Sequence, residues 1–395
     1  MKNKILPYLR TKPPKYLLDA CKLIYHQEHL QGFLKGEHIM PIHIDAGIHK
    51  GCNIRCCYCY GIYQGPTPEY IPADRLTLLA DDAKKAGIKS LAIIGDGEPT
   101  LNDGLYDFVE RLHVNHIDAA VATNGLELDE HKIKRLTHSL VWLRFNVSAV
   151  GDNYANIHKG ANRVGGWNRF VRNVNDAVKH KGRCTIGLQV VTIPQMFKDI
   201  IPLAQFALDM GVDYIVFKQF SDPEKGIPIR FDIQKEYWQA QADLAKAESM
   251  STPDTRVIIK WSAMSDSAQI TEHKNWGFDK CIDLPFIFQM SGNGKCYPCG
   301  YLFNSKEHCY GDICTDSLWD ILHSRRYRDI ISKVANTQLI ELCRGQCRHA
   351  ETNKFMDQLI KLYDGDLEKA LIKMCGSKEM YNTIMNNPPE HLNFV

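Results

Sequence analysis

The chain has 395 residues, of which 44% are hydrophobic and 24% are charged, and its formal net charge is +2. This composition is typical of a folded globular protein, and the length suits one large domain with one or two smaller ones. The nearly balanced charge does not indicate nucleic acid or an anionic membrane as a partner, because such partners select basic surfaces.

The sequence carries no targeting or membrane signal that we recognise. No run reaches the ~18 apolar residues that a membrane-spanning helix needs. Residues 1–18 contain lysines and three prolines but lack the apolar segment of a signal peptide. We therefore expect a cytoplasmic protein without a membrane partner. Since thiols stay reduced there, the fourteen cysteines indicate metal binding or catalysis rather than disulfides.

The predicted elements begin with a helical lead-in over residues 1–40, in which a helix over 14–31 ends before Gly32. From residue 41 onward, short apolar runs alternate with longer amphipathic stretches, which indicates strands and helices in turn. The expected strands are 42–46, 91–94, 119–123, 141–147, 185–191 and 214–217. The expected helices are 73–86, 105–114, 129–137, 167–180, 199–210 and 231–250.

Six strands in alternation with helices predict an α/β fold with a parallel sheet and right-handed crossovers. Six units are too few to close an eight-fold barrel, so we expect a partial (β/α)6 barrel over residues 41–260. In such folds the chemistry gathers at the C-terminal ends of the strands.

The alternation fails after about residue 260. The stretch 281–347 is rich in loops and holds seven cysteines. Its aliphatic content is too low for a large core, so we expect a small metal-bound domain over residues 261–350. Residues 351–395 are predicted to form a C-terminal helical segment.

The most informative motif follows the first strand, where Cys52, Cys56 and Cys59 have C-x3-C-x2-C spacing. Three thiolates on one loop can hold an iron–sulfur cluster and leave one iron open to a substrate molecule. The alternatives are a structural zinc and a simple electron-transfer cluster, although zinc sites usually pair two C-x2-C knuckles or add histidines. We interpret Cys57 as a packed thiol, the alternative being that it replaces Cys56.

With this loop the sequence resembles the radical S-adenosylmethionine superfamily, in which an aromatic residue precedes the last cysteine, as Tyr58 does here. The resemblance implies a [4Fe-4S] cluster whose open iron binds S-adenosylmethionine, with Tyr58 near the adenine. It further implies that one electron, from a flavodoxin- or ferredoxin-type donor, cleaves the cofactor. The product is a 5′-deoxyadenosyl radical that abstracts a hydrogen atom.

Several strand ends extend the resemblance. The run 95–99, Gly-Asp-Gly-Glu-Pro, is similar to the family motif that holds the methionine amino group, although Asp96 stands where some relatives have a small residue. Polar residues at the next strand ends correspond to groups that relatives use for the ribose and carboxylate; taken singly, each also suits a turn or a solvated strand end. The residues implied in cofactor binding are Tyr58, Gly95, Gly97, Glu98, Pro99, Thr123, Asn124, Asn146, Ser148 and Gln189.

A second group of cysteines resembles the SPASM domain, the auxiliary cluster-binding extension of many radical enzymes. Cys281, Gly294 and Cys299 have C-x12-G-x4-C spacing, and two later cysteines have C-x3-C spacing. Thr337 and Val334 stand at two cysteine positions of the full pattern, so we expect the shortened "twitch" version with one auxiliary [4Fe-4S] cluster. The expected ligands are Cys281, Cys299, Cys343 and Cys347.

Two alternatives stay open for this region. A structural zinc could occupy the same four cysteines. The remaining thiols could hold a further cluster; they are Cys296, Cys309, Cys314 and Cys375.

The resemblance covers about residues 41–350 and implies the initiating chemistry but not the substrate. Our first hypothesis is an oxidoreductase-type enzyme that oxidises or epimerises a polar small molecule, such as a sugar or aminoglycoside-like metabolite. The auxiliary cluster would accept an electron or serve structure, and Lys218 and Gln219 would face the substrate. The alternatives are a peptide or protein maturase and a non-catalytic metal-binding module. RNA modification is not favoured, because the sequence lacks a basic stripe interleaved with aromatic residues.

Overall fold

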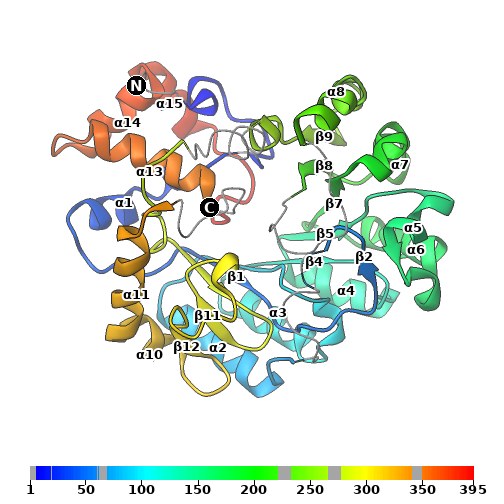
Figure 1. The fold of residues 1–395 in the computed structure, drawn as a ribbon, viewed down its shortest axis with the longest axis horizontal. Helices are drawn as coiled ribbons and strands as arrows, with labels where there is room; N and C mark the ends of the chain where they lie inside the picture. The colour runs from blue at the N-terminus through cyan, green and yellow to red at the C-terminus, as the bar shows by residue number, and fades with distance from the viewer. Residues whose placement is uncertain are drawn as a thin grey trace.

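The computed structural model describes residues 6–18, 20–59, 61, 69–220, 233–265, 277–339 and 349–395, with the side chains of helix α8 from residue 236 onward. A parallel sheet lies at the centre, and helices surround it (Figure 1). None of the described helices combines the length and the apolar character needed to cross a membrane.

The six strands expected from the sequence are confirmed. They pair in parallel and in chain order, because each is followed by a connection that returns the chain to the same edge. The strands are β1 (His43–Ala46), β3 (Ser90–Ile93), β4 (Asp118–Thr123), β5 (Trp142–Asn146), β7 (Thr185–Thr192) and β8 (Tyr214–Gln219).

Two further parallel strands extend this sheet at its two sides. β9 (Arg256–Ile259) pairs with β8, and β10 (Ile287–Met290) pairs with β1. The complete order is β12-β11-β10-β1-β3-β4-β5-β7-β8-β9, which leaves β9 as an edge strand among the described residues. The fold is therefore a partial barrel.

β10 comes from the segment predicted as the auxiliary domain, yet it is hydrogen-bonded to the first strand of the barrel. The predicted division into 1–40, 41–260, 261–350 and 351–395 stays a prediction, and its boundary after residue 260 separates segments that share one sheet. β10 continues into β11 (Lys295–Tyr297) and β12 (Gly311–Asp312), which pair antiparallel. Helices α10 (Leu318–His323) and α11 (Arg325–Asn336) follow.

The outer face of the sheet is covered by helices that pack their apolar sides against it. Leu76 and Leu79 from α2, for example, join Leu91 of β3 in the main core. The helices of this layer are α2 (Ala73–Lys85), α3 (Leu105–Val114), α4 (Glu130–Ser139), α5 (Tyr154–Ile157), α6 (Gly166–Lys179), α7 (Ile200–Met210) and α8 (Ile233–Ser249).

The inner face of the sheet is closed at the N-terminal ends of the strands by the C-terminal tail. Phe394 packs with Ala92, Ala120 and Trp142, which point inward from three neighbouring strands. Asn393 adds two hydrogen bonds: its carbonyl accepts from Ser90 Oγ at 2.5 Å, and its Nδ2 donates to an Asp118 carboxylate oxygen at 2.8 Å. In the view of Figure 1 the C-terminus accordingly lies within the ring of elements.

The N-terminal lead-in differs from the helix predicted over 14–31. Within the described part of the lead-in, only α1 (Gln27–Leu34) and two short 3-10 turns (Pro7–Arg10 and Leu23–Tyr25) are helical, and α1 runs through Gly32. Before α1, Lys22 Nζ donates to the carbonyls of His391 at 2.9 Å and Phe394 at 3.2 Å. These contacts with the far end of the chain fix the segment, and local helix propensity cannot show them.

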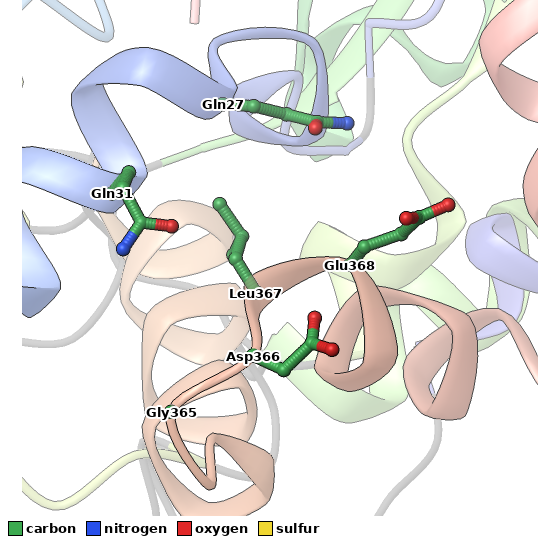
Figure 2. A pocket seen from close by; sticks show the side chains of 6 residues that line it. All are labelled: Gln27, Gln31, Gly365, Asp366, Leu367 and Glu368. Carbon is green, nitrogen blue, oxygen red and sulfur yellow. The ribbon is translucent and has the colours of Figure 1, made fainter.

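The C-terminal helices are α13 (Ala350–Leu362), α14 (Leu367–Cys375) and α15 (Lys378–Asn386), and they form a second core with α1. A pocket of about 520 Å³ lies between α1 and the start of α14 (Figure 2). Asp366 in this pocket caps α14 by accepting from the Lys369 amide at 3.0 Å. The pocket contains no residue from a strand end or from the cysteine loop.

Candidate active site

The cysteine loop follows β1 at the C-terminal edge of the sheet. Within it, the two-residue strand β2 (Arg55–Cys56) pairs antiparallel with β6 (His158–Lys159), which follows β5. The Cys52 side chain is exposed, and those of Cys56 and Cys59 are partly buried. The loop is thus anchored to the barrel through its middle cysteine.

The three thiols lie close enough to influence one another. Burial raises the pKa of Cys56 well above its ordinary value, and the thiols of Cys59 and Cys52 raise it further. Among the described side chains, no three His, Cys, Asp or Glu groups converge as ligands of one metal ion. The donor set is three thiols on one loop, none of them in a disulfide, which fits an iron–sulfur cluster, because such clusters are held by thiolates.

The glycines of the 95–99 motif allow this motif to press against the cysteine loop. A Cβ atom on Gly97 would lie 2.2 Å from the carbonyl oxygen of His49, and one on Gly95 would lie 2.2 Å from the Gly47 Cα. The Glu98 amide donates to the Gly51 carbonyl at 2.9 Å. Only glycine permits so close an approach, so these residues shape the loop itself.

The Glu98 carboxylate is buried and joins two strand ends. One oxygen accepts from the hydroxyls of Thr100 and Thr123, each at 2.6 Å, and from the Thr100 amide at 3.1 Å. The other oxygen accepts from the Asn124 amide at 2.7 Å. Burial raises the pKa of Glu98, although these hydrogen bonds lower it. The carboxylate therefore organises the loops after β3 and β4. Pro99, next to it, begins a short buried 3-10 turn.

Asp96, the departure from the family motif, contacts the auxiliary segment. Its carboxylate accepts from Ser291 Oγ at 2.5 Å and from the Gly292 amide at 2.7 Å. Both partners lie in the turn between β10 and β11. A small residue could not make these bonds, so Asp96 links the barrel motif to the auxiliary hairpin.

Tyr58 and the ends of β5 and β7 form one hydrogen-bonded group. The Tyr58 hydroxyl accepts from Asn146 Nδ2 at 3.1 Å and from Ser148 Oγ at 3.2 Å. Gln189 Nε2 donates to Asn146 Oδ1 at 3.2 Å. The structure thus brings together the four residues that the resemblance implied for the adenine, ribose and carboxylate of the cofactor.

Asn124 extends this polar rim to the cysteine loop. Its Nδ2 donates to Asn53 Oδ1 at 2.7 Å and lies 3.8 Å from the Cys52 sulfur. Asn53 in turn donates to the Glu127 carboxylate at 2.9 Å.

Lys218 belongs to a group of positive charges on the inner face. Burial first, and then the charges of Arg144 and Lys260, lower the pKa of Lys218 to about 7, although Cys59 acts in the opposite direction. Strand alternation places Arg144, Lys218 and Lys260 on the inward side, because their odd-numbered neighbours pack in the outer core. Gln219 points to the opposite side from Lys218, so the two residues expected to face the substrate are not on one face.

The auxiliary cysteines are described only in part. Cys281 and Cys299 both lie within electrostatic range of Tyr310, whose pKa is raised by burial first. Asn353 Nδ2 lies 3.6 Å from the Cys281 sulfur and donates to the Asp283 carboxylate at 2.8 Å. Cys343 and Cys347, the other two expected ligands, lie outside the described residues.

Comparison with known proteins decides the family. A model of the radical SAM superfamily matches residues 48–207, which include the cysteine loop and the ends of β3, β4, β5 and β7. Residues 48–207 belong to the radical S-adenosylmethionine superfamily. A second model, of a SPASM iron–sulfur cluster-binding domain, matches residues 281–348. Membership implies an enzyme with a [4Fe-4S] cluster that binds S-adenosylmethionine, and the second domain implies auxiliary iron–sulfur binding.

Curated radical SAM relatives match over part of their length. A GTP 3′,8-cyclase of Pelotomaculum thermopropionicum is 34% identical over 128 residues, which are 29% of this chain and 37% of the relative. A tungsten-containing aldehyde ferredoxin oxidoreductase cofactor-modifying protein of Pyrococcus furiosus is 26% identical over 175 residues, which are 42% of this chain and 48% of the relative. The chain spans less than half the length of these two proteins.

Solved radical SAM structures share the fold over most of the chain. Streptococcus suis SuiB bound to the precursor peptide SuiA gives a TM-score of 0.61 at 15% identity, covering 88% of this chain and 79% of SuiB. The anSMEcpe structure with bound AdoMet gives 0.57 at 15% identity, covering 87% and 98%. At this identity the likeness establishes the fold alone.

The sequence analysis missed several residues of this radical SAM site. His158, Lys260 and Asn53 contact or influence the predicted residues, but each reaches them through tertiary packing. His158 follows the end of β5 in a segment with no periodic pattern. The short pairing of β2 with β6, which no local signal marks, is what brings it to Cys56.

Proposed function

We propose that the chain is a radical SAM enzyme that reductively cleaves S-adenosylmethionine and abstracts a hydrogen atom from a polar small molecule. When the cluster and S-adenosylmethionine are bound, one electron would break the bond between sulfur and C5′, and methionine and a 5′-deoxyadenosyl radical would form. The radical takes a hydrogen atom from the substrate and becomes 5′-deoxyadenosine. The observation that carries the proposal is the three-thiol loop held against the strand-end motif of Gly97 and Glu98.

In this proposal the chain's own residues bind and orient the cofactor. Cys52, Cys56 and Cys59 hold the cluster, which supplies the electron and an open iron for the methionine moiety when it is bound. Tyr58, Asn146, Ser148 and Gln189 form a polar wall for the adenosine moiety. Glu98 acts by fixing Thr123 and Asn124 at the edge of the same site.

The charges on the inner face support an anionic or hydroxylated substrate over a cationic one. Arg144, Lys218 and Lys260 stand near one another and near Cys59, and an approaching carboxylate or phosphate would relieve their repulsion. An aminoglycoside-like cation would increase that repulsion. We therefore narrow the substrate class to small molecules such as sugar acids or sugar phosphates, with Lys218 as the contact.

We further propose that Cys281, Cys299, Cys343 and Cys347 hold an auxiliary [4Fe-4S] cluster. Replacement of Cys299 with alanine should remove one cluster's share of iron and sulfide per chain while 5′-deoxyadenosine still forms in the presence of reductant. Unchanged iron content would contradict the assignment. The electron for the first cluster would come from a flavodoxin- or ferredoxin-type protein.

A second candidate is a peptide maturase. It is favoured by the two fold relatives above, one of which is named as bound to a precursor peptide. Deuterium transfer separates the candidates. The anaerobically reconstituted enzyme is incubated with deuterated sugar acids, sugar phosphates or peptides, and 5′-deoxyadenosine is analysed by mass spectrometry. Deuterium from a small anionic substrate supports the first proposal, and deuterium from peptides alone overturns it.

A further inference from the structure

A buried histidine bridges the cysteine loop and the end of strand β5. His158 has no exposed surface. Its Nδ1 lies 3.1 Å from the Cys56 sulfur, and its Nε2 lies 3.0 Å from the backbone nitrogen of Ser148. One imidazole ring thus contacts both a proposed cluster ligand and a residue of the proposed adenosine wall.

The direction of these two hydrogen bonds follows from elementary chemistry. A backbone N–H can only donate, so the Ser148 amide requires a lone pair on His158 Nε2. A neutral imidazole carries its single proton on one nitrogen, which must therefore be Nδ1. The Nδ1–H then donates to the Cys56 sulfur. A ring protonated on both nitrogens would place an N–H against the Ser148 N–H.

The surrounding structure fixes the ring in this orientation. His158 and Cys56 are partners in the β2–β6 pair, and the Cys57 amide donates to the Ile157 carbonyl at 2.9 Å. The Tyr154 ring lies against the imidazole at a centroid distance of 4.5 Å, and the Tyr58 ring meets it edge-on at 6.0 Å. Backbone pairing and ring packing together hold the imidazole in place.

We propose that His158 is a positioning residue that donates an N–H···S hydrogen bond to the Cys56 thiolate of the cluster and raises the cluster's reduction potential. This inference rests on the proposed function. Hydrogen bonds to cluster sulfurs are among the factors that set the potential of an iron–sulfur centre. A donor stabilises negative charge on sulfur, and the reduced cluster carries one more negative charge than the oxidised one. The bond to Ser148 couples this effect to the strand end that faces the adenosine moiety.

The test is a redox titration of the reconstituted enzyme, monitored by electron paramagnetic resonance of the reduced cluster. In His158→Phe an aromatic ring remains, but the N–H that donates to Cys56 and the lone pair that accepts from the Ser148 amide are both lost. At a fixed ambient potential we expect the ratio of reduced to oxidised cluster to fall about tenfold, a shift of about 59 mV for one electron. His158→Gln retains an amide N–H, so its reduction potential should lie between those of the natural chain and His158→Phe. An unshifted potential in a folded, cluster-loaded His158→Phe chain overturns the inference.

Tyr154→Phe is the matched control. Its ring packs on His158, but among the described residues its hydroxyl has no hydrogen-bond partner, so its removal should leave the potential unchanged. An equal shift in this variant would mean that the shift in His158→Phe is not specific to the lost N–H donor and would overturn the inference.

A measurement on the unaltered chain keeps the inference testable if the His158 variants fail to fold. With 15N-labelled histidine, pulsed electron paramagnetic resonance of the reduced cluster should detect weak coupling to one imidazole nitrogen. A cluster without this coupling overturns the inference about His158 but leaves the proposed function intact. A reconstituted chain that holds no iron–sulfur cluster overturns the proposed function.

Discussion

At the scale of single residues, the site depends on buried polar groups whose partners are specific. Glu98 illustrates how much of the site could be predicted from the sequence. Its motif predicted a residue at the methionine end of the cofactor, and the structure shows its carboxylate occupied by Thr100, Thr123 and Asn124. The motif located the residue, but the pattern of letters could not show which donors the carboxylate meets.

Lys218 gives a prediction for pH dependence. Its pKa is lowered to about 7 in the fold, so protonation favours the unfolded chain and stability rises with pH between about 7 and 10. Lys218→Met removes this cost. Below pH 7 the variant should be more stable than the natural chain by at most about 5 kcal/mol, at 1.36 kcal/mol per pH unit of pKa shift. The gain should be smaller than this limit, because the Lys218 side chain is partly exposed and solvent screens its charge.

The measurement is denaturant unfolding of both chains at several pH values, and the gap between them should close toward pH 10. Turnover of an anionic substrate should be lost in the same variant, because the charge that receives the anion is gone. A natural chain whose stability is flat over this pH range would contradict the account.

At the scale of elements, local patterns predicted the strands and helices that follow one another in the barrel. Strand 90–93 and helix 105–114 each carry their own apolar pattern and turn signals, so the sequence sufficed. β10 was missed because its four residues lie among the cysteines of the auxiliary segment. Its pairing with β1 joins distant parts of the chain, which no local pattern encodes.

The contact between the 95–99 motif and the cysteine loop is also an element-scale property. In Gly97→Ala the new methyl group would meet the His49 carbonyl at 2.2 Å, so the two loops must separate. We expect a loss of about 1–3 kcal/mol in the free energy of unfolding, as for other overpacked sites. Iron bound by the first cluster should fall as well.

Gly300→Ala is the control for this change. A Cβ atom there meets only Gln289 Oε1, at 3.8 Å, and its backbone is not left-handed. Anaerobic iron and sulfide counts on the two variants provide the comparison. Equal counts in Gly97→Ala and the natural chain would show that the loops do not need this close approach.

At the scale of the whole molecule, the two ends of the chain complete the barrel. The C-terminal tail fills the barrel at the N-terminal ends of its strands, and Lys22 of the lead-in holds the tail in place. Such closure could not be predicted from the sequence, because Phe394 sits in a short irregular tail without a periodic pattern. The prediction of a helix over 14–31 was wrong because the contacts of Lys22 with the C-terminal tail outweigh local helix propensity.

Phe394→Ala should therefore destabilise the whole barrel. The ring is buried against Trp142, at a centroid distance of 5.5 Å, and its removal leaves a cavity on the inner face. A loss of about 3–5 kcal/mol in the free energy of unfolding is expected for such a truncation. Ile360→Ala, at a position that is 43% exposed, should change it by no more than about 0.5 kcal/mol. Similar effects of the two changes would contradict this role of the tail.

The central claim is that Cys52, Cys56 and Cys59 hold a cluster that cleaves S-adenosylmethionine. The most direct measurement is 5′-deoxyadenosine formed by the anaerobically reconstituted chain with S-adenosylmethionine and a one-electron reductant. The natural chain and the Cys57→Ala control should form it, and Cys56→Ala should form none. Formation by Cys56→Ala, or a natural chain that binds only zinc and forms no 5′-deoxyadenosine, would contradict the account.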